Sequence, residues 1–409
     1  MRRALLLLGA AALGLSACAT EPLVPPQYRS AEPAVESVTP SPSGRTAQDP
    51  TPDAGEAVTE TTAAADACRV MAEELTIEEQ VGQLFMVGVN TKGADPRTQS
   101  AIRDSKIGSV VLLGNTDAGS SAIRRLTAEL GSLGTARLPL LVAVDQEGGS
   151  VQRLKGEGFS TIPAARDQGA MGAADLSAAA FDWANELKMA GVHYDLAPVA
   201  DIVPEAKRAS NEPIGKLKRD YGSDPAAVSE SVVAFIDGMR QAGVATSVKH
   251  FPGLGEVTTN TDFGAAEDND VTRDSPHLEP FRAAIDARVD SVMISSAVFT
   301  QLDPDNEGVF SSAIITDLLR GDLGYDGVVI ADDLGAAEAV KTVAPADRAA
   351  RFIEAGGDIV INANPGIMRE MVTATLDAAA ADEAFEAQVL DAATRVLRLK
   401  STVGLVTCG

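Results

Sequence analysis

Charged side chains follow three apolar runs of the chain, at the points where the runs end. These side chains are Asp145, the pair Lys249 and His250, and Asp332. Short runs of small and β-branched residues are typical of buried parallel strands. Charged groups at the carboxyl ends of such strands face a ligand more often than they serve structure. Carboxylates can accept hydrogen bonds or attack an electrophilic carbon, whereas lysine and histidine can donate. The alternative is a turn that happens to carry these residues.

An arginine follows the first of these carboxylates. Arg153 lies shortly after Asp145, and its planar guanidinium offers donors to a hydroxyl, a carbonyl or a carboxylate. Gly148 and Gly149 stand between them and let the backbone approach a ligand closely. A structural ion pair between Asp145 and Arg153 is the alternative. We favour a ligand-binding site at this strand end.

Short apolar runs alternate with amphipathic helical patterns from residue 66 onward. Helical patterns cover, for example, Asp175–Met189, Ala226–Gln241, Leu278–Ala287 and Ser312–Leu319. Eight apolar runs with helices between them predict an α/β fold, a (β/α)₈ barrel of the TIM type, with a doubly wound open sheet as the competing fold. No GxGxxG motif follows the first run, which weakens a dinucleotide-binding interpretation. The expected strands are Leu84–Val87, Ser109–Leu113, Leu138–Val144, Tyr194–Ala197, Val244–Val248, Ser291–Ile294, Gly327–Ala331 and Ile359–Ile361.

Three segments at the ends of expected strands are similar to segments of one enzyme family. Lys249–Gly255 reads KHFPGLG and resembles the KHFPGHG signature of the β-N-acetylglucosaminidases of glycoside hydrolase family 3. Val144–Gly149 (VDQEGG) and Ile330–Leu334 (IADDL) match further segments in the same order. Three ordered matches across one barrel-length domain make a specific signal. The resemblance extends from about residue 66 to the C-terminus.

The resemblance implies a role for each charged residue at these strand ends. Asp332 is then the nucleophile that attacks the anomeric carbon, whereas Asp333 is structural and accepts hydrogen bonds from loop amides. Arg219 aligns with a substrate-binding arginine, but two extra residues precede it, so Lys216 or Lys218 could serve instead. No metal ion and no cofactor are implied. The implied substrate-binding residues are Asp145, Arg153, Arg219, Lys249 and His250.

The general acid/base of the family is missing from its usual place. The family signature continues, after four residues, into Asp-Ser-His, whose histidine is the acid/base and whose aspartate orients it. This chain has Asn260, Thr261 and Asp262 there, and none of its 3 histidines matches. Asp262 is therefore the candidate acid/base and Asn260 the candidate orienting residue, with Glu256 as a second candidate acid. An exposed aspartic acid has a pKa of about 4, so burial or neighbouring carboxylates must raise it.

The resemblance implies an exo-acting, retaining β-N-acetylglucosaminidase that removes terminal non-reducing N-acetylglucosamine, from cell-wall (peptidoglycan) fragments. Its partners would be N-acetylglucosamine-containing glycans or muropeptides. Two alternatives stay open. Loss of the Asp-His pair favours a catalytically weak or phosphate-using sugar-binding lipoprotein of the same fold. A family 3 β-glucosidase is the other alternative, although the KHFPG form fits the N-acetylglucosaminidases better.

The first 18 residues form a targeting segment. Two arginines precede an apolar run that is too short to span a membrane. Leu15-Ser16-Ala17-Cys18 resembles the bacterial lipobox, which predicts that Cys18 is lipidated and becomes the mature N-terminus. An ordinary signal peptide cleaved near Ala17 is the alternative. Residues 19–65 are rich in Pro, Ser, Thr and Ala and predict a disordered tether. We expect residues 66–409 to form the catalytic domain, outside the cytoplasm and anchored to the cell membrane by lipid.

Composition limits the partners and the redox compartment. The formal net charge is −24, which argues against binding to nucleic acid and favours a well-solvated surface; we expect a monomer. Besides Cys18 the chain has Cys68 and Cys408, which bracket the catalytic domain. In an oxidising compartment such a pair predicts a disulfide, and closing so long a loop could stabilise the fold by roughly 4–5 kcal/mol. Two free thiols are the alternative.

Overall fold

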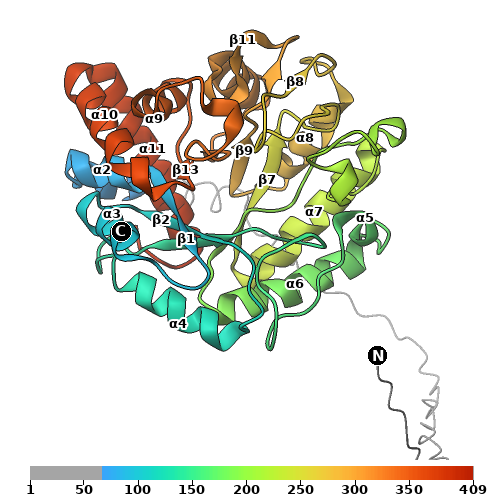
Figure 1. Ribbon diagram of the computed structural model, residues 1–409, viewed down its shortest axis with the longest axis horizontal. Coiled ribbons are helices and arrows are strands. Elements are labelled where there is room, and N and C mark those ends of the chain that lie inside the picture. Colours follow the sequence, from blue (N-terminus) through green and yellow to red (C-terminus); the bar gives the residue numbers. More distant parts are fainter. Residues whose placement is uncertain (1–66, 409) are drawn as a thin grey trace, which may run out of the picture. The chain divides into compact units, whose positions relative to one another are not determined.

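The computed structural model describes residues 67–408, and eight parallel strands form a barrel at the centre of this region (Figure 1). Each strand pairs with the next strand of the barrel in chain order, from β1 with β2 to β9 with β12. A bridge between Ile330 and Ile359 joins β12 to the edge of β13, and β13 pairs with β1, which closes the barrel. The predicted (β/α)₈ barrel is confirmed. Its strands are β1 (Phe85–Asn90), β2 (Ser109–Leu113), β3 (Leu141–Val144), β6 (Tyr194–Asp195), β7 (Ala245–Phe251), β9 (Ser291–Ile294), β12 (Val328–Ala331) and β13 (Val360–Asn362).

Helices connect the strands and lie around the barrel (Figure 1). The sequence marks their ends, as in α7, where the Asp224 side chain accepts from the backbone amide of Ala227, Pro225 takes a first-turn position, and Gly243 ends the helix at φ 78°. The helix predicted at Ser312–Leu319 is a π-helix, η5. The main helices are α2 (Ile77–Gln83), α3 (Pro96–Asp104), α4 (Ser120–Gly131), α6 (Ala173–Met189), α7 (Pro225–Ala242), α8 (Glu279–Asp286), η5 (Ala313–Asp322), α9 (Pro345–Glu354), α10 (Met368–Ala381) and α11 (Glu383–Thr402). The shorter elements are β4 (Gln146–Gly148), β5 (Val151–Gln152), α5 (Ala165–Gln168), η1 (Glu205–Lys207), η2 (Gly215–Leu217), β8 (Glu267–Asp268), η3 (Pro276–Leu278), β10 (Val298–Phe299), β11 (Asp303–Glu307), η4 (Gly308–Phe310), η6 (Glu338–Val340) and η7 (Pro365–Ile367).

Apolar side chains fill the barrel interior, and α11 covers its N-terminal end. Met86 and Ile330 of the strands belong to one buried cluster with Val396 and Leu399 of α11. Lys400 of α11 donates to groups that precede β1 and β3, which fixes the helix at this end. Because apolar packing occupies this end, a ligand site can form at the opposite end, where the strands finish and their loops begin.

Several strands differ at their ends from the predicted ranges, and in β7 and β6 the pairing with neighbouring strands decides where the strand ends. β7 continues to Phe251, beyond the predicted end at Val248, because Phe251 still pairs with Ile294 of β9 after an irregularity in register. Lys249 and His250 therefore lie within β7 rather than after its end. β6 is limited to two residues and ends at Asp195, since the ladders on both of its sides cover only those two.

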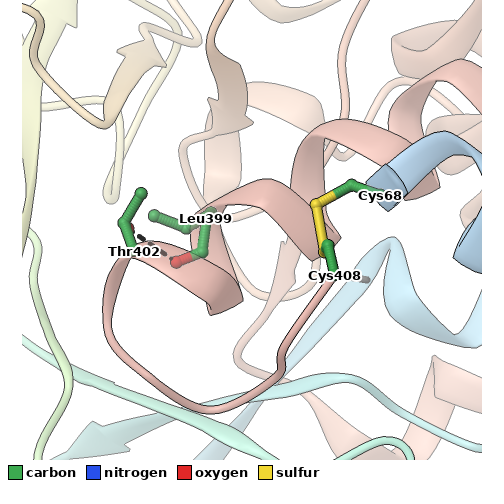
Figure 2. The surroundings of a disulfide bond; sticks show 4 residues. All are labelled: Cys68, Leu399, Thr402 and Cys408. Atoms are coloured by element: carbon green, nitrogen blue, oxygen red, sulfur yellow. Dashed lines mark hydrogen bonds between the residues drawn. A yellow bond between two sulfur atoms is a disulfide. The ribbon is translucent and has the colours of Figure 1, made fainter. Parts of the chain in front are cut away.

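The predicted disulfide between Cys68 and Cys408 is confirmed (Figure 2). The segment after α11 returns toward Cys68 at the beginning of the described chain, and Leu399 and Thr402 of α11 lie nearby (Figure 2). The two cysteines are 340 positions apart. The bond therefore joins the two ends of the barrel domain.

Loss of this disulfide should destabilise the domain. Replacing Cys68 and Cys408 by serine frees a very long loop in the unfolded chain, so we expect the free energy of unfolding to fall by about 4–5 kcal/mol. Urea denaturation of the barrel domain (residues 66–409), with and without reductant, measures the change. The double variant is its own control, because its midpoint should not respond to reductant. An unchanged midpoint of the reduced wild-type domain would contradict the expectation.

The predictions for the N-terminus, namely lipidation at Cys18 and the tether at residues 19–65, lie outside the described residues. Between residues 67 and 408, none of the helices combines the length and the apolar character that crossing a membrane requires.

Candidate active site

A cavity of about 450 Å³ opens at the carboxyl ends of the barrel strands and is lined by every predicted catalytic and substrate-binding residue except Glu256, the second candidate acid. A second cavity, of about 640 Å³, lies beside α11 at the other end of the barrel, and none of the predicted residues lines it. The first cavity is therefore the candidate active site. Its lining includes Asp145, Arg153, Arg219, Lys249, His250, Asn260, Asp262, Asp332 and Asp333.

Two cations and two carboxylates form a buried ion network on one side of the cavity. Lys249 Nζ lies 2.7 Å from Asp145 Oδ1 and 2.7 Å from Glu147 Oε1. Arg219 binds both oxygens of Glu147, at 2.7 and 2.8 Å. Burial alone would raise the pKa of Glu147, but the charges of Arg219 and Lys249 outweigh it and hold that pKa well below its usual range. Glu147 is therefore a carboxylate at neutral pH, and the network presents fixed donors and acceptors to a polar ligand.

The hairpin of β4 and β5 places Glu147 in this network. Gly148 and Gly149 adopt φ values of 103° and 54°, and a Cβ at Gly148 would lie 2.2 Å from the carbonyl oxygen of Pro163. Only glycine tolerates this approach. At the base of the hairpin, Asp195 of β6 accepts from the backbone amide of Gln146 at 2.9 Å, and burial raises the pKa of Asp195 to about 8. Protonated Asp195 adds no charge, so two cations balance two carboxylates.

Removing one cation from the buried ion network should destabilise the folded domain. Lys249 is 2% exposed, so Lys249→Met leaves Asp145 and Glu147 short of a buried partner, and we expect the free energy of unfolding to fall by about 3 kcal/mol. Lys216→Met is the matched control, because it removes an exposed pair with Glu212 and should cost less than about 1 kcal/mol. Urea denaturation compares them, and equal losses in the two variants would refute the expectation.

His250 is held by a carboxylate from a different strand end. Its Nδ1 lies 2.7 Å from Asp201 Oδ2, and Asp201 Oδ1 accepts from the backbone amides of His250 and Leu254 at 3.2 and 2.7 Å. Asp201 is fully buried. The other ring nitrogen, Nε2, lies 3.5 Å from Arg219. Asp201 therefore fixes both the ring and the start of the following loop, while His250 remains part of the cavity lining.

Both arginines that were predicted to bind substrate line the cavity, but they have different partners. Arg219 lies against Glu147 and is largely buried, whereas Lys216 and Lys218 are exposed, so Arg219 is the member of this basic run that reaches the cavity. Arg153 lines the cavity and donates to Asn115 Oδ1 at 3.3 Å. No ion pair between Asp145 and Arg153 occurs in the described part of the chain, since Asp145 pairs with Lys249. Arg153 thus keeps donors available to a ligand.

Asp332 and Asp333 follow β12, and their side chains have different surroundings. Asp333 accepts from the backbone amides of Gly335, Ala336 and Ala363 at 2.8–2.9 Å, which is the structural role predicted for it. Asp332 lines the cavity. Burial raises the pKa of Asp332, His250 lowers it, and the carboxylate of Asp262 raises it, so the pKa of Asp332 lies above its usual value. A carboxylate poised in this way is a candidate nucleophile.

Asp262 lies on an exposed turn at the cavity that is anchored by backbone hydrogen bonds. Its amide donates to Asn260 Oδ1 at 3.0 Å, so Asn260 orients the backbone of Asp262. The carbonyl of Asp262 accepts from the amide of Glu338, in the loop after Asp332, at 3.3 Å. Gly255 at the loop's start packs tightly, because a Cβ there would lie 1.7 Å from the carbonyl oxygen of Ile202. The turn carrying Asp262 is thus tied to the loop that carries the candidate nucleophile.

Glu256, the second candidate acid, is not part of the cavity lining. Its Oε1 lies 3.0 Å from His277 Nε2, and its other oxygen pairs with Lys207. These partners hold the carboxylate behind the loop. The position favours Asp262 over Glu256 as the acid/base.

A model of the glycosyl hydrolase family 3 N terminal domain matches residues 76–399. The chain belongs to glycosyl hydrolase family 3. It is 32% identical over 300 residues to a Beta-hexosaminidase of Stenotrophomonas maltophilia (strain K279a), covering 71% of this chain and 86% of that protein. A Beta-hexosaminidase of Xylella fastidiosa (strain M23) is 34% identical over 300 residues, with the same shares covered. The crystal structure of a Beta-N-acetylhexosaminidase from Beutenbergia cavernae DSM 12333 is similar with a TM-score of 0.79 and 48% identity, over 80% of this chain and 99% of that one.

Membership of glycosyl hydrolase family 3 makes the chain a glycoside hydrolase and confirms the predicted resemblance. The residues predicted from the sequence line the cavity, but the residues behind the lining were not predicted. Glu147, Asp195 and Asp201 were missed as site residues, although each follows a buried strand or ends one. That placement is a usable signal in a barrel, because strand ends converge. The individual roles of the lining residues stay predictions.

Proposed function

We propose that this family 3 glycoside hydrolase is an exo-acting, retaining β-N-acetylglucosaminidase that hydrolyses terminal non-reducing N-acetylglucosamine. The observation that supports this most is the single cavity that Asp332 lines together with Lys249, Asp145 and Arg219, which Glu147 holds from behind. The network offers charged hydrogen-bond partners to the hydroxyls of one sugar ring, next to a carboxylate that can attack it. Relatives named Beta-hexosaminidase support an N-acetylhexosamine as the sugar that is removed.

The proposed reaction uses two carboxyl groups in two steps. Asp332 attacks the anomeric carbon, the bond to the leaving oxygen breaks, and Asp262 gives its proton to that oxygen. A glycosyl ester on Asp332 results. Asp262 then takes a proton from water, the water oxygen bonds to the anomeric carbon, and the ester bond breaks to restore the carboxylate of Asp332. The β configuration is retained because the anomeric carbon is inverted twice.

Two aryl glycosides and a product analysis test the proposal. The barrel domain (residues 66–409) should release nitrophenol from an aryl N-acetyl-β-glucosaminide far faster than from an aryl β-glucoside. Nuclear magnetic resonance of the sugar first released should show the β anomer. Faster cleavage of the glucoside would favour the β-glucosidase. Tight sugar binding without turnover would favour a sugar-binding protein, and turnover that requires phosphate would favour phosphorolysis.

We also propose that the enzyme is a lipoprotein at the cell membrane that acts on cell-wall fragments. The lipobox ending at Cys18 supports the anchor. Replacing Cys18 by alanine removes the acylated thiol and should release the protein from the membrane fraction. Fractionation of cells that make either form, with immunoblotting, measures this, and Cys68→Ser/Cys408→Ser should stay in the membrane. Membrane retention of the Cys18 variant would refute lipid anchoring there.

A further inference from the structure

Two large apolar side chains stand exposed on the lining of the active-site cavity. Phe263 is 81% exposed and Leu217 is 39% exposed, and both line the cavity. Single exposed apolar residues are common on protein surfaces and need no explanation. Of the five large hydrophobic side chains that are exposed between residues 67 and 408, however, two belong to this one cavity. The others are Val70, Phe181 and Met189.

The backbone holds Phe263 in place. Its amide donates to the carbonyl of Asn260 at 3.0 Å, which closes a turn. The carbonyl of Thr261, two positions earlier, accepts from the amide of Ala339 at 3.2 Å, and Thr261 itself is buried. The turn is thus fastened to the loop that follows the candidate nucleophile. An exposed aromatic ring on an anchored turn costs little conformational entropy when it binds a ligand.

Each of these apolar residues stands beside a polar residue of the site. Phe263 follows Asp262, the candidate acid/base, and Leu217 lies two positions before Arg219 of the ion network. Arg219 and Glu147 are largely buried, whereas Phe263 and Leu217 face solvent. The cavity therefore combines buried charged groups with two exposed apolar side chains.

A glycoside could bind to both the charged and the apolar residues of this cavity. The sugar ring that is attacked lies with its hydroxyls among the buried charged groups. The group that leaves is joined through the oxygen that Asp262 protonates, so it must lie beside Asp262, whose neighbour in the chain, Phe263, lines the same cavity. A pyranose ring has an apolar face of C–H groups, and such a face packs on an aromatic ring with loss of exposed apolar surface.

We infer that Phe263 and Leu217 form a leaving-group subsite that takes a second pyranose ring by its apolar face. This rests on the proposed function. It specifies that function further, because the preferred substrate is then an oligosaccharide whose next sugar is linked directly to the terminal N-acetylglucosamine. Small acyclic leaving groups cannot use the subsite.

Selectivity between two substrates tests the subsite. The wild-type domain and Phe263→Ala are compared on the β-1,4-linked disaccharide of N-acetylglucosamine and on methyl N-acetyl-β-glucosaminide, which has no second ring. We expect Phe263→Ala to lower the ratio of the two kcat/KM values about tenfold, Leu217→Ala to lower it less, and Phe263→Trp to retain it. Phe181→Ala, which removes an exposed ring outside the cavity lining, is the matched control and should not change the ratio. Equal losses on both substrates, or no loss on the disaccharide, would overturn the subsite.

A binding measurement separates this inference from the proposed function. In a protein carrying Asp332→Asn, calorimetry gives the affinities for the disaccharide and for free N-acetylglucosamine. If the wild-type domain proves unable to hydrolyse either substrate, the proposed function fails, but Phe263→Ala should still reduce the preference for the disaccharide about tenfold. An unchanged preference would overturn the subsite alone. Absence of binding for both sugars would overturn both.

Discussion

Replacing Asp332 by asparagine should lower kcat/KM for an aryl N-acetyl-β-glucosaminide by about 10⁴-fold, since a neutral amide at this position cannot form the glycosyl ester. The substitution keeps the size and shape of the side chain. The binding network of Lys249 and Arg219 is untouched, so the affinity for N-acetylglucosamine should change much less than turnover. Steady-state kinetics and calorimetry on the same preparation measure the two effects.

Asp333→Asn is the matched control for this prediction. Asp333 accepts three backbone amides and holds the loop, so its loss should lower stability and affect activity only through the position of Asp332. A fluorinated N-acetylglucosamine-type inactivator provides a direct readout, because it should trap an ester that peptide mass spectrometry locates on Asp332. A label on Asp333 or Asp145 would assign the nucleophile elsewhere.

The barrel could be predicted from sequence because its signals are local. Each strand is a short apolar run, each helix carries its own start and stop residues, and α7 shows both within Asp224 to Gly243. The positions of Asp145, Lys249 and Asp332 in one cavity follow from the same pattern, since parallel strands of a barrel finish at one end. Strand lengths were less predictable, because the extra residues of β7 depend on pairing with β9.

Contacts between distant segments could not be predicted in this way. His250 and its partner Asp201 are 49 positions apart, and no local pattern joins them. The basic run from Lys216 to Arg219 left three candidates for the substrate-binding cation. The structure selects Arg219 because its side chain is buried against Glu147, which lies 72 positions earlier in the chain. The backbone bonds that fasten the Asp262 turn to residues 338 and 339 have the same character. Such contacts decide which of several suitable side chains faces the cavity.

Asp262→Ala should separate the two steps of the reaction. Substrates with poor leaving groups need the proton of Asp262, so we expect their kcat/KM to fall about 10²–10³-fold. Aryl substrates with good leaving groups need little acid assistance, so their first step should be nearly unaffected while hydrolysis of the glycosyl ester becomes slow. Azide needs no general base, and its addition should restore part of the turnover and yield a glycosyl azide of retained configuration.

Glu256→Gln is the control for the same kinetics. Glu256 pairs with His277 and Lys207 behind the loop, so its change should act on good and poor leaving groups alike and should not be rescued by azide. If Asp262→Ala behaves as the wild-type enzyme on both kinds of substrate, Asp262 is not the acid/base. A leaving-group dependence that appears in Glu256→Gln instead would transfer the role to Glu256.

The pH profile gives an independent measure of how closely Asp262 and Asp332 interact. After burial, the carboxylate of Asp262 is a cause of the raised pKa of Asp332. Asp332 must be ionised to attack, so kcat/KM for an activated aryl substrate is lost as the pH falls through this raised pKa. To act as the proton donor, Asp262 must keep its proton while Asp332 is ionised, so Asp262→Ala should leave the acidic limb of the profile in place. An acidic limb that moves to lower pH would mean that Asp262 is already ionised when Asp332 titrates, and an ionised Asp262 could not donate the proton to the leaving oxygen.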